Sequence, residues 1–159
     1  MADKKYIPVA LRRLVRERAN GRCEYCRCHD GFSTETCEVE HIVPRAAGGF
    51  TVLENLAYAC SGCNGRKATR IQAEDPETGE RVFLFHPRNE RWSEHFVWRS
   101  GYIEVDGKTA MGRATVAALQ LNRQSVVNLR RVLVLAGEHP PPDNLFMGLL
   151  TSAAAILQN

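Results

Sequence analysis

Four cysteines have the spacing of ligands that share one metal ion. Two Cys-x-x-Cys pairs stand 33 residues apart, Cys23 with Cys26 and Cys60 with Cys63. Each pair can form a tight knuckle that turns both sulfurs to one side, and two knuckles complete the tetrahedral shell of Zn²⁺. Four thiolates leave no open coordination position, so we predict a structural zinc that clamps residues 23–63. Four ordinary buried thiols are the alternative.

Two further cysteines, Cys28 and Cys37, stand outside these pairs. We expect each to be a small buried or loop thiol, and Cys28 with His29 is the alternative pair of zinc ligands. The first residues lack the apolar segment of a secretory signal peptide. We therefore expect a cytoplasmic protein, in which thiols stay reduced and disulfides are rare.

Polar side chains that can hold a cation and move a proton lie between and just after the cysteine pairs. Glu40 and His41 are adjacent, and Asn64 directly follows the last cysteine. A zinc ion would bring Asn64 to the start of a helix that packs on the strand carrying Glu40 and His41. Such a site can place a phosphate beside a hard cation and a general base. The candidate phosphate contacts are Arg45, Arg66 and Lys67, with solvated surface positions as the alternative.

The residue pattern also predicts the elements that must position these groups. A helix over residues 7–18 would place Leu11, Leu14 and Val15 on one side and end at Gly21, which can adopt a positive φ. Alternation of polar and apolar residues predicts a strand before Pro44. The expected elements of this part are strands over 38–43 and 56–59 and a helix over 61–71.

Beyond an acidic turn at residues 74–80, the sequence predicts strands followed by helices. We expect Trp92 to pack in the core of this half, with base stacking as its alternative. The expected elements are strands over 81–85 and 96–99, a turn containing Gly107, and helices over 115–121, 125–136 and 145–157. The other expected core residues are Trp98, Phe83, Phe85 and Phe96. His86, His95 and His139 are expected in core or surface positions, and Arg130 and Arg131 on the outer face of a helix.

Length and composition indicate a globular protein. The chain has 159 residues, of which 44% are hydrophobic and 25% charged, so wholesale disorder is excluded. No apolar run approaches the roughly 20 residues of a membrane span. The formal charge of +3 is unevenly distributed. Residues 1–70 carry 12 basic and 8 acidic side chains, whereas residues 71–159 carry 9 and 10. The basic excess therefore lies in the half with the candidate phosphate chemistry.

Several ordered motifs resemble the HNH nucleases, which have a ββα-metal fold. The motifs are C-E-Y-C at 23–26, E-H-I-V-P-R-A-A-G-G at 40–49, E-N-L at 54–56 and C-S-G-C-N-G-R-K at 60–67. The resemblance covers roughly residues 22–70. It implies that His41 is the general base, that Glu40 is a ligand of the catalytic metal, and that Asn55 holds the loop that orients His41. F-H-P-R-N-E-R-W-S-E-H-F at 85–96 is similar to the tail of a bacterial HNH subgroup.

The sequence departs from the family at the last motif position. Asn64 stands where the family usually has a histidine that is the second metal ligand, so the chain reads H-N-N. A carboxylate with an amide oxygen suits Mg²⁺ or Mn²⁺, whereas an imidazole would favour softer metals. The resemblance therefore implies catalysis with Mg²⁺ or Mn²⁺ beside the structural Zn²⁺.

These observations combine into one prediction of fold and function. We expect an α+β fold with an HNH core in residues 1–73, including a leading helix, and a β-hairpin and helical extension in residues 74–159. The expected activity is metal-dependent hydrolysis of DNA, taken to be double-stranded, by a single metal and a histidine base. The alternatives are a non-catalytic zinc-containing nucleic-acid-binding module and an RNA-directed nuclease toxin. A partner protein or a homodimer is expected to supply specificity, and no membrane association is expected.

Overall fold

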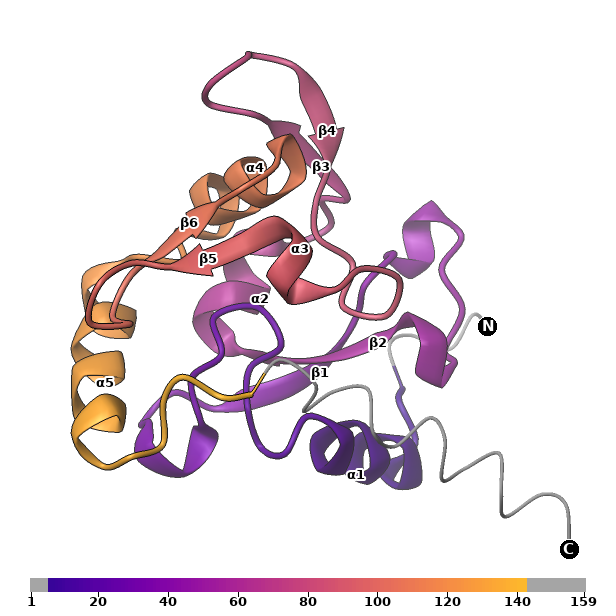
Figure 1. The fold of residues 1–159 in the computed structure, drawn as a ribbon. Coiled ribbons are helices and arrows are strands. Elements are labelled where there is room, and N and C mark those ends of the chain that lie inside the picture. Colours follow the sequence, from indigo (N-terminus) through magenta and orange to yellow (C-terminus); the bar gives the residue numbers. More distant parts are fainter. Residues whose placement is uncertain (1–5, 143–159) are drawn as a thin grey trace, which may run out of the picture.

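An antiparallel hairpin lies at the centre of the computed structural model, which describes residues 6–142 (Figure 1). Strand β1 (Cys37–His41) pairs with β2 (Leu56–Cys60), so that Cys37 faces Cys60 and His41 faces Leu56. Helix α1 (Val9–Arg18) packs on one side of the hairpin and α2 (Ser61–Lys67) on the other. This is the expected ββα arrangement with a preceding helix. The helix predicted over 145–157 lies outside the described residues.

Helix α1 contacts the hairpin through a narrower stripe than the sequence predicts. Val15 is fully buried against Leu56 and Tyr58, but Leu14 is 44% exposed. Residues 11, 15 and 18 follow one helical stripe, and position 14 lies to its side. Arg18 completes the stripe because its buried guanidinium donates to the carbonyls of Leu53 and Leu56, at 2.9 and 2.6 Å. Gly21 ends this region with the expected positive φ, +66°.

The second half consists of two small hairpins and two helices. Helix α2 ends before the predicted residue 71 because Ala68, with φ +49° and ψ −124°, turns the chain out of the helix. Helix α4 begins earlier than predicted because the Thr109 side chain caps it, accepting from the N–H of Gly112. No described helix has the length and apolar character needed to span a membrane. The elements are β3 (Gln72–Glu74), β4 (Arg81–Phe83), α3 (Trp92–His95), β5 (Phe96–Trp98), β6 (Val105–Gly107), α4 (Ala110–Leu119) and α5 (Gln124–Leu135).

One apolar core joins the two halves. Phe85, Trp92 and Phe96 are buried in it, as predicted, together with Tyr25 and the four paired cysteines. The prediction for Phe83 is wrong, since its side chain is 58% exposed. Burial alternates along β4, which turns Val82 inward and Phe83 outward on a hairpin that projects from the body (Figure 1).

Arg130 is a second correction, because it is fully buried and not on the outer face of its helix. Its guanidinium donates to the carbonyl oxygens of Cys26 and Ile103 at 3.0 and 3.1 Å and lies 5.0 Å from the centre of the Trp98 ring. Carbonyl partners and an aromatic face compensate the loss of water around the charge. Arg131 is exposed, as predicted.

Candidate active site

The paired cysteines form one buried cluster. Their four sulfur atoms lie within 4.8 Å of one another, and the Sγ atoms of Cys26 and Cys60 are 3.8 Å apart. A tetrahedron of thiolates at about 2.3 Å from Zn²⁺ has edges of about 3.8 Å. The cluster therefore fits a structural zinc ion, as the spacing predicts. Such an ion would join the knuckle after α1 to the end of β2 and to α2.

Arg123 lies directly against this cluster and was not identified as a site residue from the sequence. Its guanidinium nitrogens are 3.5 Å from Sγ of Cys63 and 3.3 Å from Sγ of Cys60. Four thiolates around Zn²⁺ leave a net negative charge, which a neighbouring guanidinium offsets. The only sequence signal was Arg123 in the segment before α5, far from the cysteine motifs.

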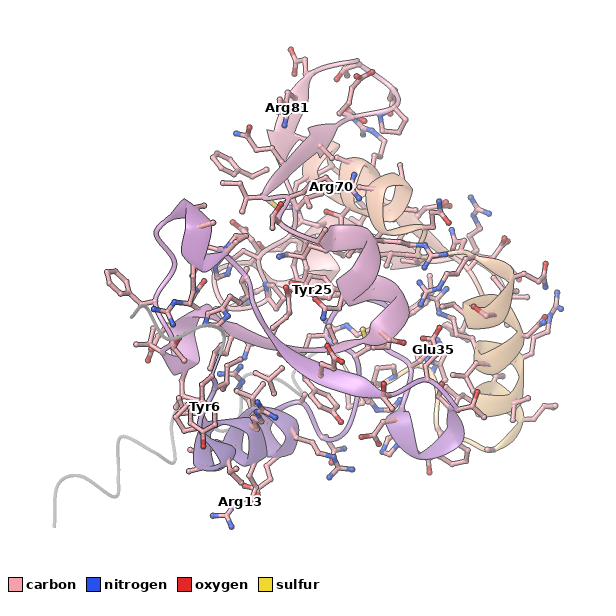
Figure 2. All side chains as sticks on the ribbon, turned by 180° about the vertical axis from the view of Figure 1, so that it is seen from behind. Tyr6, Arg13, Tyr25, Glu35, Arg70 and Arg81 are labelled. Carbon is pink, nitrogen blue, oxygen red and sulfur yellow. The ribbon has the colours of Figure 1, made fainter. Side chains whose placement is uncertain are left out.

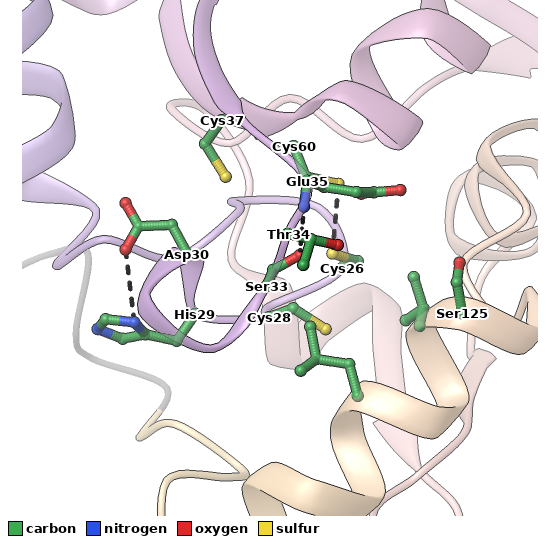
Figure 3. A pocket seen from close by; sticks show the side chains of 12 residues that line it. Cys26, Cys28, His29, Asp30, Ser33, Thr34, Glu35, Cys37, Cys60 and Ser125 are labelled. Carbon is green, nitrogen blue, oxygen red and sulfur yellow. Dashed lines mark hydrogen bonds and ion pairs between the residues drawn. The ribbon is translucent and has the colours of Figure 1, made fainter.

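The two remaining cysteines border a small cavity next to the zinc cluster (Figure 3). Cys28 is buried and Cys37 half-buried, in agreement with the expected small thiols. The cavity measures about 160 Å³. The His29 ring accepts from the N–H of Gly31 and faces Asp30. Among the described residues, the four-sulfur cluster includes neither Cys28 nor His29, so the alternative ligand pair is not supported.

His41 is the last residue of β1 and is half-buried. Its Nε2 lies 2.8 Å from the hydroxyl oxygen of Thr51, in the loop that leads to β2. Partial burial, with the positive charges of Arg45 and Lys67, holds the pKa of His41 below its ordinary value. The imidazole is therefore neutral at neutral pH. When Nε2–H donates to the hydroxyl, the lone pair of Nδ1 is left to accept a proton.

Asn55 holds the loop that follows His41. Its amide oxygen accepts from the N–H of Val43 at 2.9 Å, and its amide nitrogen donates to the carbonyls of Val43 and Phe50 at 3.0 and 2.9 Å. Gly49 makes this close packing possible, because a Cβ there would stand 1.8 Å from the Val43 oxygen. The main chain on both sides of Thr51 is thus fixed relative to β1.

Glu40 is buried and already paired within the protein. Its carboxylate accepts from the hydroxyl of Tyr25 and from Nζ of Lys67, the latter at 3.0 Å. Burial raises the pKa of Glu40, and the Lys67 charge opposes this rise. Lys67 is only 1% exposed and also lies 3.4 Å from the carbonyl oxygen of His41. The expectation that Lys67 contacts a phosphate is therefore not met in this structure.

Asn64 lies beside a glutamate that was missed as a site residue. Its amide nitrogen donates to Glu38 at 3.1 Å. Glu38 and Glu40 are two residues apart in β1, so both face α2, whereas alternation directs His41 to the other side. The structure thus gathers Glu38, Glu40 and Asn64 but turns His41 away from the carboxylates. The signal for Glu38 was the alternating E-V-E segment. The gathered oxygen donors are of the kind that suits a hard divalent cation.

The arginines predicted to contact phosphate lie on exposed elements. Arg45 is exposed at the start of a short 3-10 turn (Arg45–Ala47). Arg66 bonds Gly62 and Gln120 along α2, both at 3.1 Å. Arg70 follows on the same side of the molecule as α2 (Figure 2) and bonds the carbonyl of Ala118 at 3.1 Å. A basic edge therefore borders α2.

Comparisons with known proteins agree with this geometry. Residues 23–70 match the family model of the HNH endonucleases. The chain is 29% identical to the Septu protein PtuB of Bacillus thuringiensis over 133 residues, which are 82% of this chain and 47% of that protein. It is 23% identical to the Septu protein PtuB of Bacillus mycoides (strain KBAB4) over 168 residues, 83% of this chain and 57% of that protein.

The chain thus spans about half the length of these curated relatives. The similarity reaches well beyond residues 23–70, so it includes much of the extension. No solved structure matches the chain. The ββα arrangement, the four-cysteine cluster and the family match together assign residues 23–70 to an HNH endonuclease domain.

Proposed function

We propose that this protein is a metal-dependent DNA endonuclease in which His41 is the general base. The observation that carries the proposal is the setting of His41 at the end of β1. Its ring is held through Nε2 by Thr51, and its pKa is held below the ordinary value by burial and by nearby positive charge. A neutral imidazole with one free ring nitrogen can take a proton from an attacking water at neutral pH.

The catalytic metal would be held by oxygen atoms of Glu40 and Asn64, with Glu38 as a further donor. Carboxylate and amide oxygens favour Mg²⁺ or Mn²⁺. A divalent cation bound there would stabilise the negative charge that grows on the scissile phosphate. The ion pair between Lys67 and Glu40 must loosen for Glu40 to serve as a ligand. Asn55 contributes by fixing the loop that carries Thr51, and so the orientation of the His41 ring.

The substrate contacts follow from the exposed cations. Arg45 stands close enough to His41 to affect its pKa, and Arg66 lies on α2 beside Asn64. We propose that both contact backbone phosphates of double-stranded DNA, which would position the duplex without reading its sequence. Specificity then comes from elsewhere, through a partner protein or a second copy of the chain.

A plasmid assay with a metal series tests the proposal. The protein is incubated with supercoiled plasmid in Mg²⁺, in Mn²⁺ and in EDTA, and nicked and linear products are separated on a gel. We expect cleavage with either metal and none in EDTA. The variant His41→Ala should cleave about 10²–10⁴-fold more slowly. The matched control is His29→Asn, because asparagine can still accept from the N–H of Gly31.

Two results would overturn the proposal: equal cleavage in EDTA, or full activity of His41→Ala. Zinc content is measured in parallel, because EDTA that removed the structural zinc would stop cleavage by unfolding the protein. Loss of cleavage with zinc retained separates the two metals.

The second candidate is a zinc-containing module that binds nucleic acid without cutting it. The Lys67–Glu40 ion pair favours this candidate, because it occupies the carboxylate that a catalytic metal would need. The same assay distinguishes the two functions. Shifted but intact plasmid at every metal concentration would indicate the binding module.

A further inference from the structure

A pocket of about 270 Å³ lies between the HNH domain and the extension, directly beside the candidate active site. Ile42 and Val43, the two residues after His41, form one wall together with Lys67. The extension supplies the opposite wall. The pocket therefore begins where the proposed catalytic strand ends.

The opposite wall combines apolar surface with polar groups. Phe83 lies at the pocket and is 58% exposed, which is unusual for a large apolar side chain. His86 also lines the pocket, and its Nδ1 accepts from the N–H of Arg88 at 3.3 Å. Since Nδ1 is the acceptor, the proton of the neutral ring is on Nε2, which can donate to a ligand. Asn89 adds an amide that can both donate and accept.

We propose that this pocket receives one unpaired base of the DNA strand that is being cut. The inference rests on the proposed nuclease function and adds a site for a base to it. An apolar cavity with an aromatic face and a few polar groups suits a flat heterocycle, which stacks on one side and bonds at its edge. A phosphate suits it poorly, because the only pocket-lining cation among the described residues, Lys67, already pairs with Glu40.

The position of the pocket supports a base from the same strand. Its wall continues directly from His41, so a nucleotide whose phosphate lies at His41 has its neighbour at the pocket. A paired base cannot enter, since the duplex holds it in the stack, and extrusion costs a few kcal/mol. Sites with a mismatch, a bulge or a nearby single-stranded segment should therefore be preferred.

Binding measurements with a cleavage-impaired protein test the inference. The His41→Ala variant is titrated into two DNA duplexes of the same sequence, one fully paired and one with a single unpaired 2-aminopurine. We expect tighter binding of the second duplex and a change in 2-aminopurine fluorescence on binding. Adding Phe83→Ala should reduce the preference about 5- to 150-fold, because stacking on an aromatic ring contributes about 1–3 kcal/mol per base.

The matched control is Phe32→Ala, which removes another exposed phenylalanine that does not line this pocket. It should keep the full preference for the unpaired base. Equal binding of both duplexes, or an unchanged preference in Phe83→Ala, would overturn the inference and leave the nuclease proposal intact. Stacking in this assay without plasmid cleavage by the wild-type protein would instead overturn the nuclease and keep the pocket assignment. Absence of any DNA binding would overturn both.

Discussion

The two ends of the β1–β2 hairpin are fixed by different means. At one end, Cys60 stands opposite Cys37 and belongs to the four-sulfur cluster. At the other end, His41 stands opposite Leu56, and Asn55 holds the connecting loop through bonds to main-chain atoms. A metal cluster ties together segments far apart in the chain, whereas an amide side chain fixes one local loop.

The difference assigns stability to one end and chemistry to the other. Structural zinc contributes directly to the free energy of folding. Loops held by a few hydrogen bonds lie at the low-stability end of a protein, and binding and catalysis concentrate there. Damage at the zinc end should therefore unfold the protein, and damage at the loop end should remove activity from a folded protein.

Removing a zinc ligand should have the largest effect. Cys60→Ser should lose zinc and most of the folded structure, since structural zinc contributes about 10–16 kcal/mol in small zinc domains. Zinc content and far-UV circular dichroism measure this. Cys28→Ser is the matched control, because Cys28 is equally buried but lies outside the cluster. A folded, zinc-free Cys60→Ser protein would contradict the assignment of stability to this end.

Removing the loop bonds should have an intermediate effect on stability and a large one on activity. Asn55→Ala leaves main-chain groups of Val43 and Phe50 without their partner and should lower the free energy of unfolding by about 2–3 kcal/mol. Urea unfolding and plasmid cleavage measure the two effects, and zinc content should stay unchanged. Asn128→Ala, on the exposed side of α5, serves as the control. Full cleavage activity in Asn55→Ala would break the division between the ends.

The cation beside the zinc cluster should have a smaller effect. Arg123→Ala should weaken zinc binding about 10-fold, the lower range for partners in the outer shell of a metal site. Competition with a chromophoric chelator measures the affinity. Arg123→Lys should recover part of it because the charge remains, and Arg131→Ala should change nothing. Unchanged affinity in Arg123→Ala would restrict the zinc end to its four cysteines.

The smallest effect concerns the charge around His41. Burial is the main cause of its lowered pKa, and Arg45 adds to the shift, so Arg45→Gln should move the pKa of His41 toward its ordinary value. Nuclear magnetic resonance titration of the ring protons in the free protein measures it. Because the folded-state pKa is depressed, the neutral ring stabilises the fold above the unfolded-state value of about 6.5, and this stabilisation is lost as the pH falls through the folded-state pKa. A downward shift in Arg45→Gln would contradict the assignment.

The sequence predicted long or chemically marked features well. Helix α1, the β1–β2 hairpin and the cysteine cluster follow from periodicity and from the Cys-x-x-Cys spacing. Strands β3 and β6 and helix α3 were missed because three or four residues do not establish a period.

Side-chain partners were harder to predict than elements. The pairing of Lys67 with Glu40 depends on how α2 lies across β1, which no local pattern specifies. Arg130 was misplaced because arginine is usually exposed, and its partners, Cys26 and Ile103, come from distant parts of the chain. Phe83 was misplaced because the projection of the β3–β4 hairpin is a tertiary feature.

The register of the central hairpin limits how the length of this protein can vary. Because side chains alternate along a strand, one residue inserted within β2 would exchange the faces of every following position. Cys60 would then turn away from the other sulfurs, or the zinc would hold it and shift the pairing of His41 with Leu56. Insertions in the exposed turn around Gly79 meet no such constraint. Related chains should therefore vary in length at that turn while keeping the spacing from Leu56 to Cys60 fixed.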